Sequence, residues 1–151
     1  MRPFDRVIVA DWSAAGSASP ARPSANAIWL GISDGAGTET RYFRSRASAE
    51  GYLAEAVAAC QGRLLIGFDF PMGYPAGFAA RVTGVPTARA VWGWLAQHLS
   101  DAPDNRNTRF ETAAGINAAL GGAGPFWGRP HSLPLPALPE TKAVDYPALG
   151  L

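Results

Sequence analysis

Two short apolar segments, each associated with an aspartate, constrain the fold of this 151-residue chain more than any other feature. Residues 6–10 (RVIVA) run into Asp11, and residues 64–70 (LLIGFDF) are apolar except for Asp69 and stop at Pro71. Continuous apolar runs of this length are typical of central β-strands that are covered on both faces. The two segments therefore predict an α/β fold built on a buried sheet.

The chain between these segments predicts a hairpin and a helix. Residues 27–32 (AIWLGI) and 38–44 (TETRYFR) predict two further strands, because the Asp34-Gly35 dipeptide between them is a hairpin signal. Residues 48–60 carry apolar side chains at helical spacing and predict a helix that Ser48 caps. A right-handed crossover through that helix places the fourth strand parallel to the first.

The second half of the chain predicts helices followed by an irregular tail. Residues 88–99 and 107–120 have the spacing of helices, whereas residues 125–151 contain six prolines and little periodicity. We therefore expect a mixed-sheet α/β domain over residues 1–124 and a Pro-rich irregular tail over 125–151. Because a compact domain rarely ends in this way, we also expect the chain to be a truncated part of a longer protein.

The composition excludes several classes of protein. A net charge of +1 argues against a disordered polyelectrolyte and against a whole-surface binder of nucleic acid or membranes. One cysteine excludes an internal disulfide framework and a Cys-rich zinc site, and two histidines argue against a histidine-based metal site. No apolar run approaches the ~18 residues of a membrane span, and the N-terminus lacks the apolar region of a signal peptide. We expect a soluble, cytoplasmic protein with no membrane partner.

Asp11 and Asp69 are the strongest candidate site residues. If their strands lie side by side and parallel, both carboxylates fall at the sheet edge where α/β proteins bind ligands, on strands about 4.8 Å apart. Two ionised carboxylates this close repel each other, and a divalent cation between them removes the repulsion. Oxygen ligands without Cys or His favour Mg²⁺ or Mn²⁺ over Zn²⁺. The alternative is structural: Asp11 caps the following loop, and Asp69 accepts turn hydrogen bonds.

The same residues resemble a known superfold. The segment VIVADWS (7–13), the hairpin, the helix and LLIGFDFPMGYP (64–75) resemble the ribonuclease H-like superfold. Within it they resemble an uncharacterised bacterial family of predicted nucleases, which carries an I-G-x-D-x-P-x-G element. Here that element is Ile66, Gly67, Asp69, Pro71 and Gly73. The resemblance covers roughly residues 4–130 and implies two-metal phosphodiester hydrolysis, with Asp11 as the shared ligand and Asp69 as a second ligand.

The resemblance also implies a third acid from a later helix. Glu111 is the candidate metal ligand, and its alternative role is that of capping-box partner to Thr108. Ser13, in the small-residue loop 12–26, is a candidate contact for a substrate phosphate, although such segments are more often simply flexible. His98 has no acid or nucleophile nearby in the sequence, so we expect no catalytic histidine.

Three functions remain open. The paired aspartates favour a Mg²⁺- or Mn²⁺-dependent nuclease or phosphoesterase with a nucleic acid or nucleotide as partner. Actin-like nucleotide-binding ATPases and kinases share this strand order, but residues 11–19 (DWSAAGSAS) match their phosphate loop only loosely. The 29 alanines and the proline-rich tail instead favour a truncated, non-catalytic module or a homo-oligomer. Some longer relatives carry labels from molybdopterin or cobalamin biosynthesis, a chemistry that these residues do not support.

Overall fold

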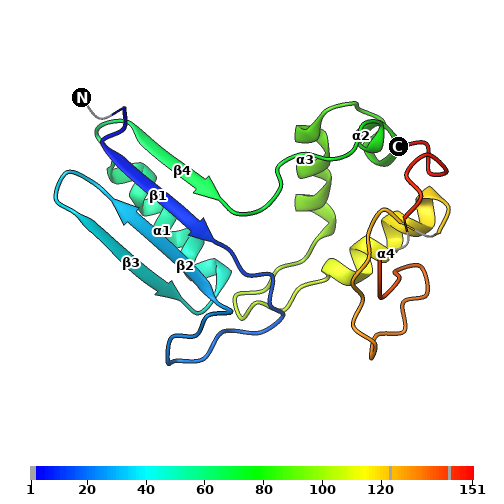
Figure 1. Ribbon diagram of the computed structural model, residues 1–151, viewed down its shortest axis with the longest axis horizontal. Helices are drawn as coiled ribbons and strands as arrows, with labels where there is room; N and C mark the ends of the chain where they lie inside the picture. The colour runs from blue at the N-terminus through cyan, green and yellow to red at the C-terminus, as the bar shows by residue number, and fades with distance from the viewer. Residues whose placement is uncertain (1–2, 123, 143) are drawn as a thin grey trace. The chain divides into compact units, whose positions relative to one another are not determined.

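The computed structural model describes residues 3–122, 124–142 and 144–151, and it has an α/β fold with a four-stranded mixed sheet and several helices (Figure 1). By contacts the chain divides into two compact units. We call them the sheet unit (Met1–Phe70 with Asp101–Arg106) and the helical unit (Pro71–Ser100 with Asn107–Leu151). In chain order the elements are β1 (Arg6–Asp11), β2 (Ile28–Ser33), β3 (Thr38–Phe43), α1 (Arg46–Ala59), β4 (Leu64–Phe68), α2 (Phe78–Thr83), α3 (Ala88–His98) and α4 (Arg109–Leu120).

The sheet has the strand order β3-β2-β1-β4. β1 pairs antiparallel with β2 and parallel with β4, which confirms the predicted crossover, and β2 pairs antiparallel with β3. The predicted turn between β2 and β3 is also confirmed, because the Asp34 amide donates to the Gly37 carbonyl and the Asp34 carboxylate accepts from the Ala36 amide. The turn fixes the register of the hairpin, and the crossover helix places β4 beside β1.

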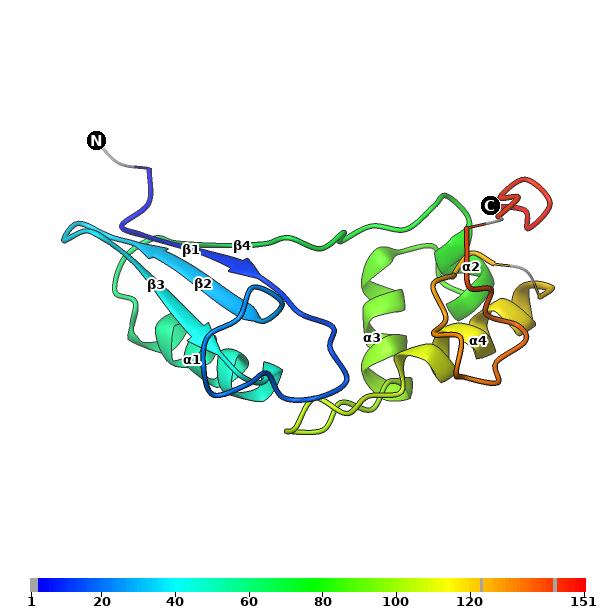
Figure 2. The same ribbon diagram turned by 60° about the horizontal axis from the view of Figure 1, so that its bottom comes forward.

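The core of the sheet unit lies between the sheet and α1, which covers one face (Figure 2). Alternate residues of β1 and β2 point toward the helix, because side chains alternate between the two faces of a strand. Ile8, Ala10 and Leu30 are fully buried there against Leu53 and Ala56 of α1. The buried residues of this core are small and medium aliphatic side chains, and larger rings such as those of Trp12 and Phe68 pack around them.

The opposite face of the sheet, which we call the open face, departs from the prediction. Val9 of β1 is 55% exposed and Leu65 of β4 is 43% exposed, so the expectation of strands covered on both faces is wrong for these two positions. The apolar runs are continuous, but only every second side chain joins the core. The first residue of α1 differs as well, since Ser45 rather than Ser48 caps the helix by accepting the Ser48 amide.

The helical unit is built around a second core. Phe78 of α2, Val91 of α3, and Ile116 and Leu120 of α4 are buried there together with Leu149 from the C-terminal segment. The sequence patterns predicted α3 and α4 but missed α2. That helix has only six residues, and glycines with positive φ, Gly77 and Gly84, lie at its two caps.

Residues 125–151 form no helix or strand where the structure describes them, as expected, but they belong to the packed helical unit. Asn117 of α4 is fully buried and explains part of this packing. Its Nδ2 donates to the carbonyls of Phe126 and Ala137, each at 2.8 Å, and its Oδ1 accepts from the Phe126 amide at 2.9 Å. One side chain thus satisfies the polar backbone of an irregular segment at two points. None of the described helices is long and apolar enough to cross a membrane.

Candidate functional site

Asp11 and Asp69 lie next to each other at the carboxyl edge of the sheet. Asp11 is the last residue of β1, and Asp69 follows directly after β4. The parallel register pairs Ala10 with Phe68, and the Asp69 amide continues the ladder by donating to the Ala10 carbonyl at 3.2 Å. The next residues in register are therefore the two aspartates, as the sequence predicted.

The two side chains play different local roles. Asp11 is exposed and lies two residues after Val9, so the two side chains are on the same, open face of the sheet, whereas that of Ala10 is on the buried face. Asp69 is also exposed, and its Oδ1 accepts the Trp12 amide at 2.9 Å. This bond takes the place of the next ladder bond and holds the chain leaving β1 against the end of β4. The structural role of Asp69 therefore differs from the expected one, because its carboxylate accepts a long-range bond from the end of β1 and not a turn hydrogen bond. Only one of its two carboxylate oxygens is used in the contacts described.

Ser13 lies two residues beyond Asp11, in a loop that is held in place. Its hydroxyl oxygen accepts the Ala15 amide at 3.3 Å, and its carbonyl accepts Nη1 of Arg46 at 3.0 Å. Arg46 Nη1 also donates to the Ala15 carbonyl at 2.9 Å. The loop after β1 is thus anchored near the candidate site, so the purely flexible alternative does not describe its start.

A buried polar cluster that sequence patterns did not reveal provides this anchor. Arg46, the first residue of α1, is buried and forms a two-pronged ion pair with Asp101, at 2.5 Å from Nε and 2.6 Å from Nη2. Asn105, also buried, accepts the Arg46 amide and donates to the carbonyls of Ser17 and Arg44. These contacts join residues 55 to 88 positions apart, so only the folded chain brings them together.

Three aromatic rings lie at the same end of the sheet. The Trp12 ring packs edge-on against Phe68 at 5.8 Å and against Phe70 at 6.5 Å between centroids, and Phe68 and Phe70 are 5.0 Å apart. Trp12 and Phe68 also pack against the core, whereas Phe70 is 42% exposed. The carboxyl edge of β1 and β4 therefore offers two acidic groups and an accessible aromatic surface.

The donor set at this edge fits a hard divalent cation. Two carboxylates are oxygen ligands of the kind that Mg²⁺ and Mn²⁺ prefer, and Mg²⁺ commonly binds through one or two carboxylates with water and substrate phosphate completing its shell. In the part of the chain that the structure describes, His, Cys, Asp and Glu form no group of three or more able to hold a metal. The structure thus brings together two of the predicted acids but does not add a third.

Glu111 lies in the first turn of α4 and belongs to the helical unit. The alternative prediction, that Glu111 and Thr108 form a capping box, is wrong, because the Thr108 side chain makes no capping hydrogen bond to α4. Thr108 Oγ1 instead accepts the Ser100 amide at 2.9 Å. Glu111 is exposed and lines a cavity of the helical unit. Trp94 and His98, for which we predicted no site role, line the same cavity.

Comparisons with known proteins do not assign the chain to a family. No protein-family model matches it, and no match was found among curated proteins or among solved structures.

Proposed function

We propose that the carboxyl edge of β1 and β4 binds Mg²⁺ or Mn²⁺, and that the chain is a metal-dependent phosphoesterase or nuclease of the ribonuclease H-like type. The observation that supports the proposal is the register that makes Asp11 and Asp69 neighbours on parallel strands. The chain order is also the one that the resemblance implies: the strand β1, the hairpin of β2 and β3, the helix α1, and then β4 parallel to β1.

The two aspartates have distinct tasks in this proposal. Asp11 offers a carboxylate with no hydrogen bond or ion pair among the described residues, and Asp69 offers the oxygen that the Trp12 amide does not use. The Trp12 amide fixes the orientation of the Asp69 carboxylate. A bound cation polarises a phosphoryl oxygen and lowers the pKa of a coordinated water. A phosphate of the substrate completes the ligand set, which accords with a site of only two protein carboxylates.

The partner that fits this edge is a nucleotide or a nucleic acid. The exposed Phe70 ring, backed by Trp12 and Phe68, supports this choice, because nucleobases stack on accessible aromatic side chains. Ser13 stays a candidate phosphate contact through its hydroxyl hydrogen, since the oxygen of that hydroxyl already accepts the Ala15 amide.

One observation favours a second candidate function. Val9 and Leu65 are exposed on the open face, which suits a non-catalytic module that associates through its sheet. Such a module also accords with the finding that residues 3–122, 124–142 and 144–151 contain no group of three metal-ligating side chains. Such a module would bind no divalent cation at Asp11 and Asp69.

The test is hydrolysis of bis-p-nitrophenyl phosphate and of labelled single- and double-stranded oligonucleotides by the full chain, with Mg²⁺, with Mn²⁺ and with EDTA. We expect metal-dependent cleavage that falls at least about a hundredfold in Asp11→Asn and in Asp69→Asn, because loss of even an outer-shell partner costs 10–100-fold. Asp69→Asn retains an oxygen that accepts the Trp12 amide, so it removes the charge and keeps the local structure.

Glu55→Gln is the matched control, since Glu55 is exposed on α1 and the same carboxylate-to-amide change there leaves the site intact. Cleavage that persists in Asp11→Asn, or that is equal with EDTA, would contradict the proposal.

A further inference from the structure

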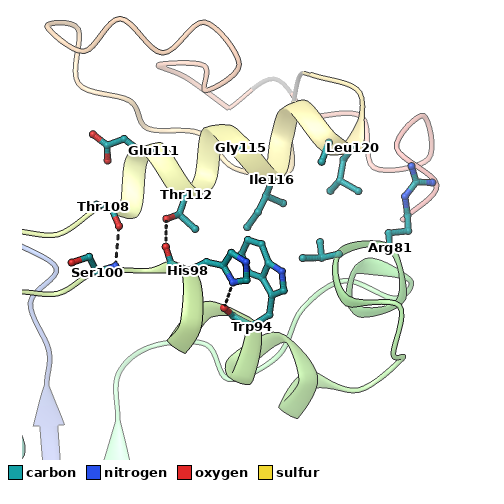
Figure 3. Close-up of a pocket in the computed structure, with 12 residues that line it drawn as sticks. Arg81, Trp94, His98, Ser100, Thr108, Glu111, Thr112, Gly115, Ile116 and Leu120 are labelled. Atoms are coloured by element: carbon teal, nitrogen blue, oxygen red, sulfur yellow. Dashed lines mark hydrogen bonds between the residues drawn. The ribbon is translucent and has the colours of Figure 1, made fainter.

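The helical unit contains a cavity of about 590 Å³ between α3 and α4, with Arg81 of α2 at one end (Figure 3). Val82 of α2 also lines it. Its lining comes entirely from the helical unit, so the cavity is independent of the β1–β4 edge and of the function proposed for it. Cavities of 300–1,000 Å³ are typical of sites for small molecules.

One wall of the cavity is an aromatic pair. The rings of Trp94 and His98, one helical turn apart on α3, are stacked with centroids 3.9 Å apart and planes 7° from parallel. His98 Nδ1 lies 2.7 Å from the Trp94 carbonyl oxygen. A carbonyl oxygen only accepts, so Nδ1 carries the hydrogen and the ring orientation is fixed. The flat wall therefore exists before any ligand binds.

The rest of the cavity is largely apolar and has charged residues at its ends. Ile116 and Leu120 of α4 face the aromatic pair across the cavity (Figure 3). Glu111 lies at the end near Ser100 and Thr108, and its carboxylate is directed away from the rings (Figure 3). At the other end, beside Leu120, the guanidinium of Arg81 is directed away from the rings and lies next to Gly150, and it forms no hydrogen bond or ion pair with the residues that the structure describes (Figure 3).

This combination selects a particular kind of ligand. An apolar cavity with a preformed aromatic wall favours a flat ring, because aromatic groups gain from offset stacking as well as from burial. An available guanidinium at one end favours a carboxylate, which Arg binds through two parallel hydrogen bonds. We propose that the cavity binds a small aromatic carboxylate, with its ring against the Trp94–His98 pair and its carboxylate toward Arg81.

The experiment titrates the ¹⁵N-labelled full chain with 2-naphthoate and, separately, with 2-naphthamide, which has the same rings and no charge. We expect saturable shifts of the amides of α3, α4 and residues 81–82, with the acid binding roughly fivefold or more tightly than the amide, as for a partly exposed ion pair. Arg81→Gln should remove this preference and leave binding of the amide unchanged.

Two variants separate binding from folding. Arg89→Gln is the matched control for Arg81→Gln, because Arg89 is exposed on α3 and does not line the cavity, and it should leave both affinities unchanged. His98→Leu removes the stacked ring at an exposed position, where it is expected to leave the fold intact, and should weaken both probes several-fold.

Three results would overturn the proposal. The first is the lack of saturable shifts with 2-naphthoate at millimolar concentration. The second is equal affinity for acid and amide, unaltered by Arg81→Gln, which would make the cavity a non-selective apolar gap. The third is a set of shifts centred outside the cavity.

Discussion

The sheet unit and the helical unit organise their cores in different ways. In the sheet unit, the buried residues alternate along strands and meet one helix, as Ile8, Ala10 and Leu30 do. In the helical unit, three helices share their core with irregular chain, and the buried Leu149 comes from a segment without helix or strand. Periodic patterns therefore describe the first core well and the second core only in part.

Both units also depend on a buried polar residue that joins distant segments. Arg46 does this in the sheet unit, where it holds Ser13, Ala15 and Asp101. Asn117 does it in the helical unit, where it holds Phe126 and Ala137. The difference is that Arg46 supports a loop beside a candidate site, whereas Asn117 supports the packing of the C-terminal segment.

We expect Arg46→Met to destabilise the protein most. It removes a buried guanidinium from Asp101, whose side chain is 35% exposed, and leaves the carbonyls of Ser13 and Ala15 without their donor. Each buried acceptor left without a donor costs about 1–3 kcal/mol, so we expect the free energy of unfolding to fall by more than about 3 kcal/mol. Urea unfolding measures the loss. Arg106→Met is the control, because the Arg106–Asp104 pair is exposed, and it should change the midpoint far less. Equal effects of the two variants would show that the buried cluster does not stabilise the loop.

The next prediction compares the stability contributions of the two faces of the sheet. Leu30→Ala empties a fully buried position and should lower the free energy of unfolding by about 3 kcal/mol. Val9→Ala, on the open face and 55% exposed, should lower it by less than about 1 kcal/mol. Chemical denaturation of both variants checks this, and a loss as large for Val9 as for Leu30 would mean that the open face is covered in solution.

A smaller effect is expected in the helical unit. Asn117→Ala removes three hydrogen bonds to the backbone of the C-terminal segment, and we expect a loss of about 2 kcal/mol. Hydrogen exchange should show reduced protection of the Phe126 amide, which donates to Asn117. Gln97→Ala, at an exposed position of α3, should alter neither quantity. Unchanged protection of Phe126 would contradict the anchoring role.

The sequence allowed the sheet and the pairing of Asp11 with Asp69 to be predicted, because strand pattern, hairpin turn and crossover handedness act locally or follow general rules. The Arg46 cluster and the Asn117 contacts could not be predicted in this way, since they join residues 9 to 88 positions apart along the chain. The exposure of Val9 and Leu65 was also missed, because a continuous apolar run does not reveal which face of a sheet is covered.

Only part of the candidate site could be predicted from the sequence. The adjacency of the two carboxylates follows from parallel pairing, which the pattern indicated. The bond from the Trp12 amide to Asp69 depends on how the chain leaves β1, and the aromatic rings of Trp12, Phe68 and Phe70 meet only once β4 lies beside β1. Glu111 was a candidate because the resemblance implies a third acid from a later helix, and position on a helix does not determine which acids meet.

A titration of the ¹⁵N-labelled chain with Mn²⁺, whose paramagnetism broadens the signals of nearby amides, tests directly whether Asp11 and Asp69 share a cation. At low Mn²⁺ we expect broadening centred on residues 11–13 and 67–70. Asp11→Asn and Asp69→Asn should abolish this broadening, and Glu55→Gln should retain it. Broadening that is unchanged in both aspartate variants, or that is centred elsewhere in the chain, would contradict the claim that Asp11 and Asp69 share a cation.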